Sequence, residues 1–171
     1  MKLTVRETAV FAMLGALMYA SKMIMEVVPN VHLLGMFVVA FTAVYRKKAL
    51  YPIYVFVFLI GLMNGFATWW LPYLYIWAVL WGATMLLPKN VPEKWKPLMY
   101  MAVCAAHGYL YGTLYAPAQA MLFGLDFNGM ITWIAAGLPF DMVHGTSNLL
   151  CGVMIYPLVQ LLEHMEKHSI A

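Results

Sequence analysis

The sequence predicts an all-α membrane protein with six transmembrane helices, and three observations lead to this prediction. Of the 171 residues, 64% are hydrophobic and only 10% are charged, whereas about a quarter of the residues in a soluble domain are charged. Breaks in the apolar pattern divide the chain into six segments, and the basic residues lie almost entirely on one side of them. No linker separates the segments, so we expect a single membrane domain, residues 1–171.

Each segment ends where charged, proline-containing or glycine-containing residues interrupt the apolar pattern. A bilayer core about 30 Å thick requires about 20 apolar residues in each helix. "VVPN" follows the first segment, "YRKK" the second, "WWLP" the third, "PKNVPEKWKP" the fourth and "GLDFNG" the fifth. The second segment is short for a span, and the last is long enough to extend into the cytoplasm. The expected spans are residues 8–27, 32–45, 49–67, 70–87, 98–123 and 130–162.

Basic residues predict how these segments are oriented. With six spans, nine of the ten Lys and Arg residues fall on one side, and basic loops stay in the cytoplasm. We therefore expect both termini to be cytoplasmic, in a bacterial-type cytoplasmic membrane, and we expect no nucleic-acid partner. Glu7 interrupts the basic N-terminal region, which favours a retained first span over a cleaved signal peptide. The nine residues are Lys2, Arg6, Arg46, Lys47, Lys48, Lys89, Lys94, Lys96 and Lys167.

The first segment has a polar face and a face of small residues. Lys22 lies in its outer third and Glu26 one turn further on, so the two can form an ion pair. Two interpretations stay open for the pair: an interfacial contact without a ligand, or part of an outward-facing binding site. Small residues at intervals of three or four let another helix approach closely, within the bundle or from a partner. These residues are Ala9, Ala12, Ala16 and Ala20.

Aromatic residues gather at the start of the fourth segment, where Trp and Tyr commonly form a belt at the membrane interface. Tyr73, Trp77 and Trp81 also recur at intervals of four and extend one stripe below that interface. Such a stripe is suited to stacking against a flat ring. Asn64, at the end of the third segment, maps to the same outer half of the membrane.

The fifth segment repeats the pairing of a polar and a small face. His107, Tyr111 and Tyr115 recur at i, i+4 and i+8, with Gln119 one turn beyond. This predicts a polar seam inside the bundle, either for binding or purely for hydrogen bonding between helices. Beside it runs a stripe of small residues, Ala105, Gly108, Gly112 and Ala116.

The last segment carries Asp141, His144 and Asn148 within an arc of about 60°, at 100° per residue. We expect this face to point inward, because an ionised group facing lipid costs several kcal/mol. Asp141 is placed near the membrane midplane, as a floor for an outward-facing pocket. His144 and His107 are placed deeper and close together, and Asn148 deeper still.

This combination resembles the substrate-binding S components of energy-coupling factor (ECF) vitamin importers, which are small six-helix proteins with an alanine stripe on the first helix. The last segment, "PFDMVHGTSNLLCGVMIYPL", is similar to the final helix of many S components in Pro139, Asp141, His144, Asn148 and Pro157. The resemblance covers nearly the whole chain in length and topology.

The resemblance implies a substrate-capturing subunit that docks on a membrane coupling subunit (the T component) serving two cytoplasmic ATPases. Ala12, Ala16 and Ala20 are then the docking residues. ATP is hydrolysed by the partners, so we expect no enzymatic activity, cofactor or resident metal in this chain. Members that import nickel or cobalt carry His after the initiator Met, where this chain has Lys2. The substrate favoured is a planar, vitamin-like heterocycle.

The candidate substrate-binding residues are Lys22, Glu26, Asn64, Tyr73, Trp77, Trp81, Tyr111, Tyr115, Gln119, Asp141 and His144. His107 and Asn148 are assigned to contacts between helices. Two alternatives stay open. Asp141, His144 and His107 form a donor set suited to zinc or to acid–base catalysis in a membrane-embedded enzyme, although no established catalytic motif is present. The second alternative is a structural membrane subunit without a ligand.

Overall fold

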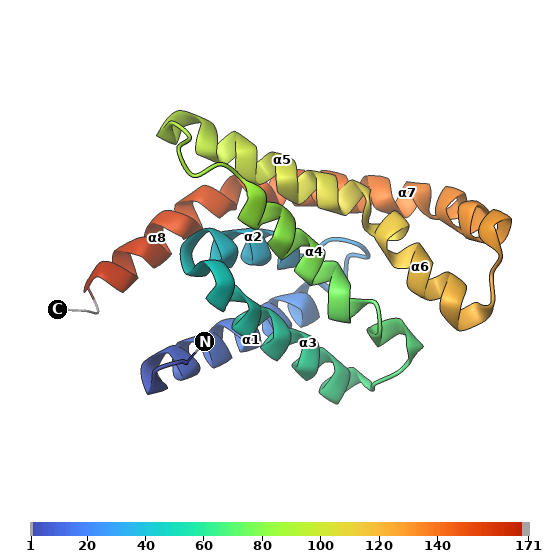
Figure 1. Ribbon diagram of the computed structural model, residues 1–171, viewed down its shortest axis with the longest axis horizontal. Coiled ribbons are helices and arrows are strands. Elements are labelled where there is room, and N and C mark those ends of the chain that lie inside the picture. Colours follow the sequence, from blue (N-terminus) through green and yellow to red (C-terminus); the bar gives the residue numbers. More distant parts are fainter. Residues whose placement is uncertain (1, 169–171) are drawn as a thin grey trace.

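The computed structural model describes residues 2–168, and in this range regular structure consists of α-helices and short 3₁₀ helices without a β-strand (Figure 1). The all-α prediction is therefore confirmed for this part of the chain. The α-helices are α1 (Val5–Met25), α2 (Leu34–Tyr45), α3 (Leu50–Asn64), α4 (Tyr73–Leu86), α5 (Lys96–Tyr109), α6 (Tyr111–Phe123), α7 (Phe127–Cys151) and α8 (Ile155–His168). The 3₁₀ helices are η1 (Arg46–Ala49), η2 (Thr68–Trp70), η3 (Glu93–Trp95) and η4 (Gly152–Met154).

Three continuous helical stretches within residues 2–168 are long and apolar enough to cross a membrane: Val5–Met25, Leu34–Asn64 and Phe127–His168. This agrees with a location in the membrane. The second stretch contains α2, η1 and α3. The chain turns at η1, so α3 runs at an angle to α2 in Figure 1. The third contains α7 and α8, joined through η4.

The expected segment 98–123 is not one helix, because α5 ends at Tyr109 and α6 begins at Tyr111. Leu110 between them has φ −99° and ψ 5°, outside the helical range. The first N–H groups of a helix lack partners within it, and here the Gly112 amide donates to Asp141 Oδ1 at 2.8 Å. A carboxylate on α7 thus stabilises the beginning of α6, where the helix dipole favours negative charge.

Glycines allow α5 and α7 to lie side by side along one edge of the bundle (Figure 1). A Cβ added to Gly108 would lie 2.8 Å from Gly145 Cα and 2.9 Å from the His144 carbonyl oxygen. Asn148 joins the same helices by donating from Nδ2 to the Cys104 carbonyl at 3.1 Å. The small stripe predicted in this segment is therefore an interhelical contact surface, and all four of its residues are buried.

Helix α2 lies at the centre of the bundle, where Leu34–Thr42 is buried without a break. On α1, Gly15 faces α3, since a Cβ there would lie 2.5 Å from Val55 Cγ1. The predicted alanine stripe of α1 faces away from the bundle. Its residues, Ala9, Ala12, Ala16 and Ala20, are all exposed.

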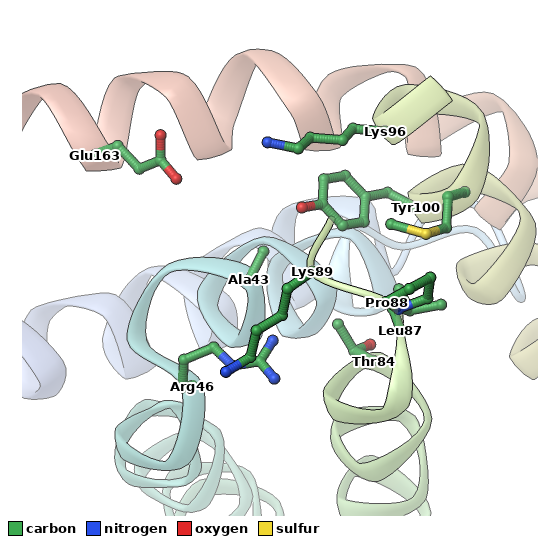
Figure 2. A pocket seen from close by; sticks show the side chains of 10 residues that line it. Ala43, Arg46, Thr84, Leu87, Pro88, Lys89, Lys96, Tyr100 and Glu163 are labelled. Atoms are coloured by element: carbon green, nitrogen blue, oxygen red, sulfur yellow. The ribbon is translucent and has the colours of Figure 1, made fainter. Parts of the chain in front are cut away.

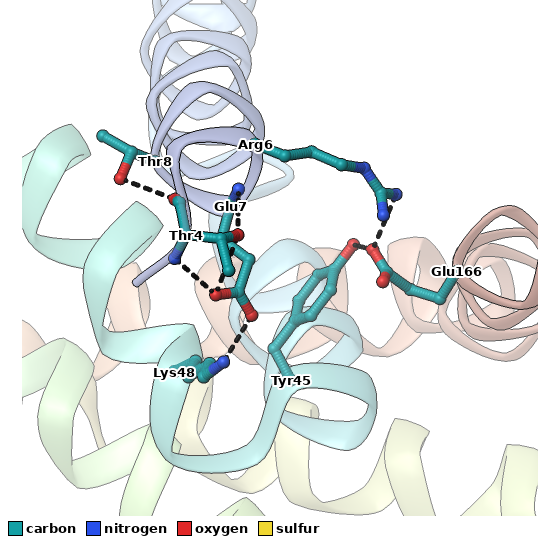
Figure 3. Close-up of polar contacts among 7 residues, drawn as sticks. All are labelled: Thr4, Arg6, Glu7, Thr8, Tyr45, Lys48 and Glu166. Carbon is teal, nitrogen blue, oxygen red and sulfur yellow. Dashed lines mark hydrogen bonds and ion pairs between the residues drawn. The ribbon is translucent and has the colours of Figure 1, made fainter. Parts of the chain in front are cut away.

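A polar network near the chain ends joins α1, η1 and α8 (Figure 3). Thr4 and Glu7 form a capping box at the start of α1, and Glu7 also pairs with Lys48 of η1. Tyr45 donates to Glu166 Oε1 at 3.4 Å, and Arg6 Nη2 lies 3.9 Å from the same oxygen. Through Glu166, α8 thus contacts both Arg6 of α1 and Tyr45 at the end of α2.

The start of α1, the end of α8, η1 and the α4–α5 loop lie toward one end of the bundle in Figure 1, while the α3–α4 and α6–α7 connections lie toward the other. The first end contains the predicted basic loops, and we call it the basic end. Here Glu93, in the α4–α5 loop, accepts hydrogen bonds from Lys96 at the start of α5 and from Tyr156 of α8. The bond from Lys96 is the largest of the causes that lower the pKa of the Glu93 carboxyl, and the bond from Tyr156 is the next.

Candidate functional site

A hollow of about 450 Å³ lies among the end of α1, the α1–α2 loop, the start of α4, α6 and α7. We call it the aromatic hollow. It brings together residues that are far apart in the sequence but were predicted to share a site. Six of the predicted binding residues line it: Lys22, Glu26, Tyr73, Tyr111, Tyr115 and His144.

The predicted ion pair lies at this hollow. Lys22 Nζ is 3.2 Å from Glu26 Oε1. The Lys22 side chain is 19% exposed and that of Glu26 58% exposed, so the acid is the more accessible partner. Because both residues line the hollow, the pair presents one positive and one negative group to whatever enters it.

Two imidazoles meet on the wall of the aromatic hollow. His32 Nε2 lies 2.6 Å from His144 Nε2, and the Tyr111 ring stacks on His144 with a centroid distance of 4.5 Å and an interplanar angle of 16°. A hydrogen bond between two imidazole nitrogens needs one donor and one acceptor, so one ring supplies an unprotonated nitrogen. Both rings line the hollow beside an aromatic surface, and His32 Nδ1 is buried without a hydrogen-bond partner among residues 2–168.

His32 was missed by sequence reasoning, and so were Asn30 and Trp69, which also line this hollow. His32 and Asn30 lie in the α1–α2 loop, where no helical period relates a residue to a face. The only available signal was that the loop between the first two segments contains a histidine. Trp69 belongs to the aromatic cluster that was noted as a membrane-interface belt.

Trp77 is 1% exposed and does not line the aromatic hollow, but its ring packs against residues that do. Its ring centroid lies 5.9 Å from His32, 5.8 Å from Tyr73 and 6.2 Å from Tyr111. His107 packs behind Trp77 at 5.8 Å and its Nε2 contacts the Ile76 carbonyl oxygen at 3.1 Å. The position of His107 fits the predicted interhelical role.

A second hollow of about 510 Å³ lies between α6 and α7, and we call it the α6–α7 hollow. It contains Gln119 and Asp141 and shares Tyr111, Tyr115 and His144 with the aromatic hollow. Only one Asp141 oxygen is used by Gly112. The other, Oδ2, is buried and has no hydrogen-bond partner among residues 2–168.

Two predicted binding residues lie away from both hollows. Asn64 is exposed at the end of α3. Trp81 donates from Nε1 to the Arg46 carbonyl at 3.1 Å, near the basic end. The interval of four that relates Tyr73, Trp77 and Trp81 keeps them on one face, but eight residues of helix carry Trp81 about 12 Å from Tyr73 along the axis.

Within the part of the chain that the structure describes, no three His, Cys, Asp or Glu side chains are arranged to hold a metal ion. Asn148 lies between α5 and α7, in agreement with its predicted interhelical role. Comparison of the whole chain with family models, with curated proteins and with solved structures finds no match.

Proposed function

We propose that this chain is the substrate-capturing subunit of an ECF-type importer and that it binds a small planar heterocycle in the aromatic hollow. The observation that carries the proposal is the composition of that hollow. Its volume, about 450 Å³, is within the range of about 300–1,000 Å³ that is typical of small-molecule sites. Its walls combine aromatic rings with a few polar groups, as such sites generally do.

The proposed topology has six membrane spans and both termini in the cytoplasm. The arrangement of the basic end supports it, because the start of α1, the end of α8 and the two basic loops gather there. The aromatic hollow is formed by the last turn of α1 and the start of α4, which are the helix ends away from the basic end. A substrate would then enter from the outside.

The lining divides into parts that suit different groups of one ligand. Tyr73 and Tyr115 offer ring faces for a flat heterocycle, and His144, which lines the hollow, offers an imidazole for a hydrogen bond to a ring nitrogen or substituent. The Lys22–Glu26 pair at the hollow suits a charged or strongly polar substituent. The structural-subunit alternative needs a bundle without a cavity beside Tyr115, and this hollow argues against it.

The proposed partners are the T component and two cytoplasmic ATPases. The outward-facing alanines of α1 support a docking role, because small residues let a second membrane helix approach closely. Ala12, Ala16 and Ala20 remain the proposed contacts. Gly15, about 100° around the helix from Ala16, is used for packing on α3, so the glycine and the alanine stripe face different directions.

The enzyme alternative is less well supported by the contacts of its candidate residues. Asp141 accepts the Gly112 amide, and His107 is engaged with the Ile76 carbonyl behind Trp77. These contacts leave His144 as the one member of the three that lines the aromatic hollow. We therefore assign the three side chains to binding and to helix packing.

The test is to purify the protein in a mild detergent, denature it and identify any released small molecule by mass spectrometry. A stoichiometric planar heterocycle in the wild type that is lost from Tyr115→Ala supports the proposal. Tyr156→Ala makes the same change at the basic end and should retain the compound. Stoichiometric zinc in place of a heterocycle, or equal retention by the two variants, would refute this assignment of the site.

A further inference from the structure

A separate hollow of about 300 Å³ lies at the basic end, among η1, the end of α4, the start of α5 and α8 (Figure 2). We call it the basic hollow. Arg46, Lys89 and Lys96 line it, and Glu163 is the only acidic residue among the lining residues. Three positive groups thus face one negative group. Figure 2 shows Lys89 extending toward Arg46, while Lys96 and Tyr100 enter from α5.

Arg46 is held in place by its backbone as well as by its side chain. It has φ 53° and ψ −119°, a conformation that usually requires glycine. Its carbonyl accepts the Trp81 Nε1–H at 3.1 Å, and its Nη2 donates to the Met85 carbonyl at 3.1 Å. A guanidinium has five N–H donors, so most of them stay available at the edge of the hollow.

The other cations of the basic hollow are only partly compensated. Lys96 pairs with Glu93, which lies outside the lining. Lys89 forms no ion pair within residues 2–168. Like charges gathered around one cavity repel each other, and a bound anion would relieve that repulsion. Arginine and lysine together favour a phosphate group, which accepts several charge-assisted hydrogen bonds at once.

We propose that the basic hollow binds the phosphate group of an anionic molecule. Two sources share this chemistry: the headgroup of an anionic phospholipid in the adjacent leaflet and a soluble phosphate ester. The basic hollow is independent of the substrate site, because α4 leads from Tyr73 in the aromatic hollow to Leu86 next to this one, about 20 Å along the axis. Its occupancy is therefore separable from substrate binding.

The test uses the purified full chain in dodecyl maltoside micelles, which contain no phosphate, and counts bound dioleoyl phosphatidic acid by native mass spectrometry. We expect Lys89→Ala to raise the dissociation constant about fivefold, the contribution of one basic residue near an anionic surface. Arg46→Gly should raise it at least as much, and glycine suits that backbone conformation. Lys94→Ala is the matched control, since Lys94 lies in the same loop but over the Trp95 ring and outside the hollow.

Competition distinguishes the two sources. If glycerol 3-phosphate displaces the lipid, a soluble phosphate ester is a ligand of the site; if it does not, the ligand is the lipid headgroup. Three results would overturn the proposal: no retention of phosphatidic acid, equal retention of the phosphate-free anion oleate, or equal weakening by Lys94→Ala and Lys89→Ala.

Discussion

Replacement of Gly108 by alanine tests the close packing of α5 on α7. The added Cβ would lie 2.7 Å from Asn148 Nδ2, 2.8 Å from Gly145 Cα and 2.9 Å from the His144 carbonyl oxygen. Two of these atoms belong to the backbone of α7, so no side-chain rotation can relieve the overlap. The helices must separate, and the cost should be near the upper end of overpacking penalties, about 3 kcal/mol.

Alanine also favours a helix over glycine by about 1 kcal/mol, which leaves a net destabilisation of about 2 kcal/mol for Gly108→Ala. For a chain of this size that corresponds to a fall in Tm of about 4–8 °C. Gly82→Ala is the matched control, because a Cβ on that α4 glycine meets no atom within 4 Å. Only the helix preference then acts, and Tm should rise by about 2–4 °C.

The measurement is thermal unfolding of both variants in the same detergent, followed by intrinsic tryptophan fluorescence. The two substitutions are chemically identical, so a general effect of alanine on helices or on detergent binding would move both in the same direction. Opposite signs are expected. A rise in Tm for Gly108→Ala that equals the rise for Gly82→Ala would refute the packing of α5 against α7.

Three further predictions concern the binding site, the docking face and the basic end. Trp77→Ala should weaken binding of the co-purified heterocycle at least tenfold, since it removes the ring supporting the aromatic hollow. Trp95→Ala, at an exposed position, should leave the affinity unchanged. Equal affinities of the two variants in a fluorescence titration would show that Trp77 does not support the site. Ala16→Trp should spare that binding but abolish co-purification with the T component. If the complex still assembles with Ala16→Trp but not with Leu17→Trp, the docking face lies elsewhere on α1. Because hydrogen bonding lowers the pKa of Glu93 from its ordinary value near 4.5, the carboxylate stabilises the fold above that pH. The Tm of Glu93→Gln should then lie below wild type at pH 7 and converge with it as the pH falls through the lowered pKa of Glu93. A difference that is constant with pH would contradict this.

Helical periodicity was the most informative feature of the sequence for the site. Asp141, His144 and Asn148 were predicted to share one inward face, and all three are buried against α5 and α6. The reason is general: in a helix surrounded by lipid, polar groups and glycines on one side have no favourable alternative to facing a neighbouring helix. The prediction needed only the angle of 100° per residue.

Periodicity could not predict what depends on contacts between distant segments. Leu110 carries no intrinsic signal for a helix break, and the break is stabilised by a carboxylate 31 positions further along the chain. His32 lies in a loop, where the direction of a side chain depends on the whole surrounding structure. Trp81 had the correct face but the wrong depth, because periodicity relates residues by angle and says little about where a cavity ends.

Asp141 combines both cases, because periodicity predicted its inward face but not its contact with the start of α6. Its Oδ1 accepts the Gly112 amide near the start of α6, and this contact requires a glycine, since a Cβ there would lie 2.6 Å from Asp141 Oδ2. The break at Leu110 turns α6 away from the axis of α5, and α6 carries Tyr111 and Tyr115 into both hollows. The same carboxylate therefore shapes the aromatic wall through one oxygen, while its other oxygen, Oδ2, is buried without a hydrogen-bond partner among residues 2–168.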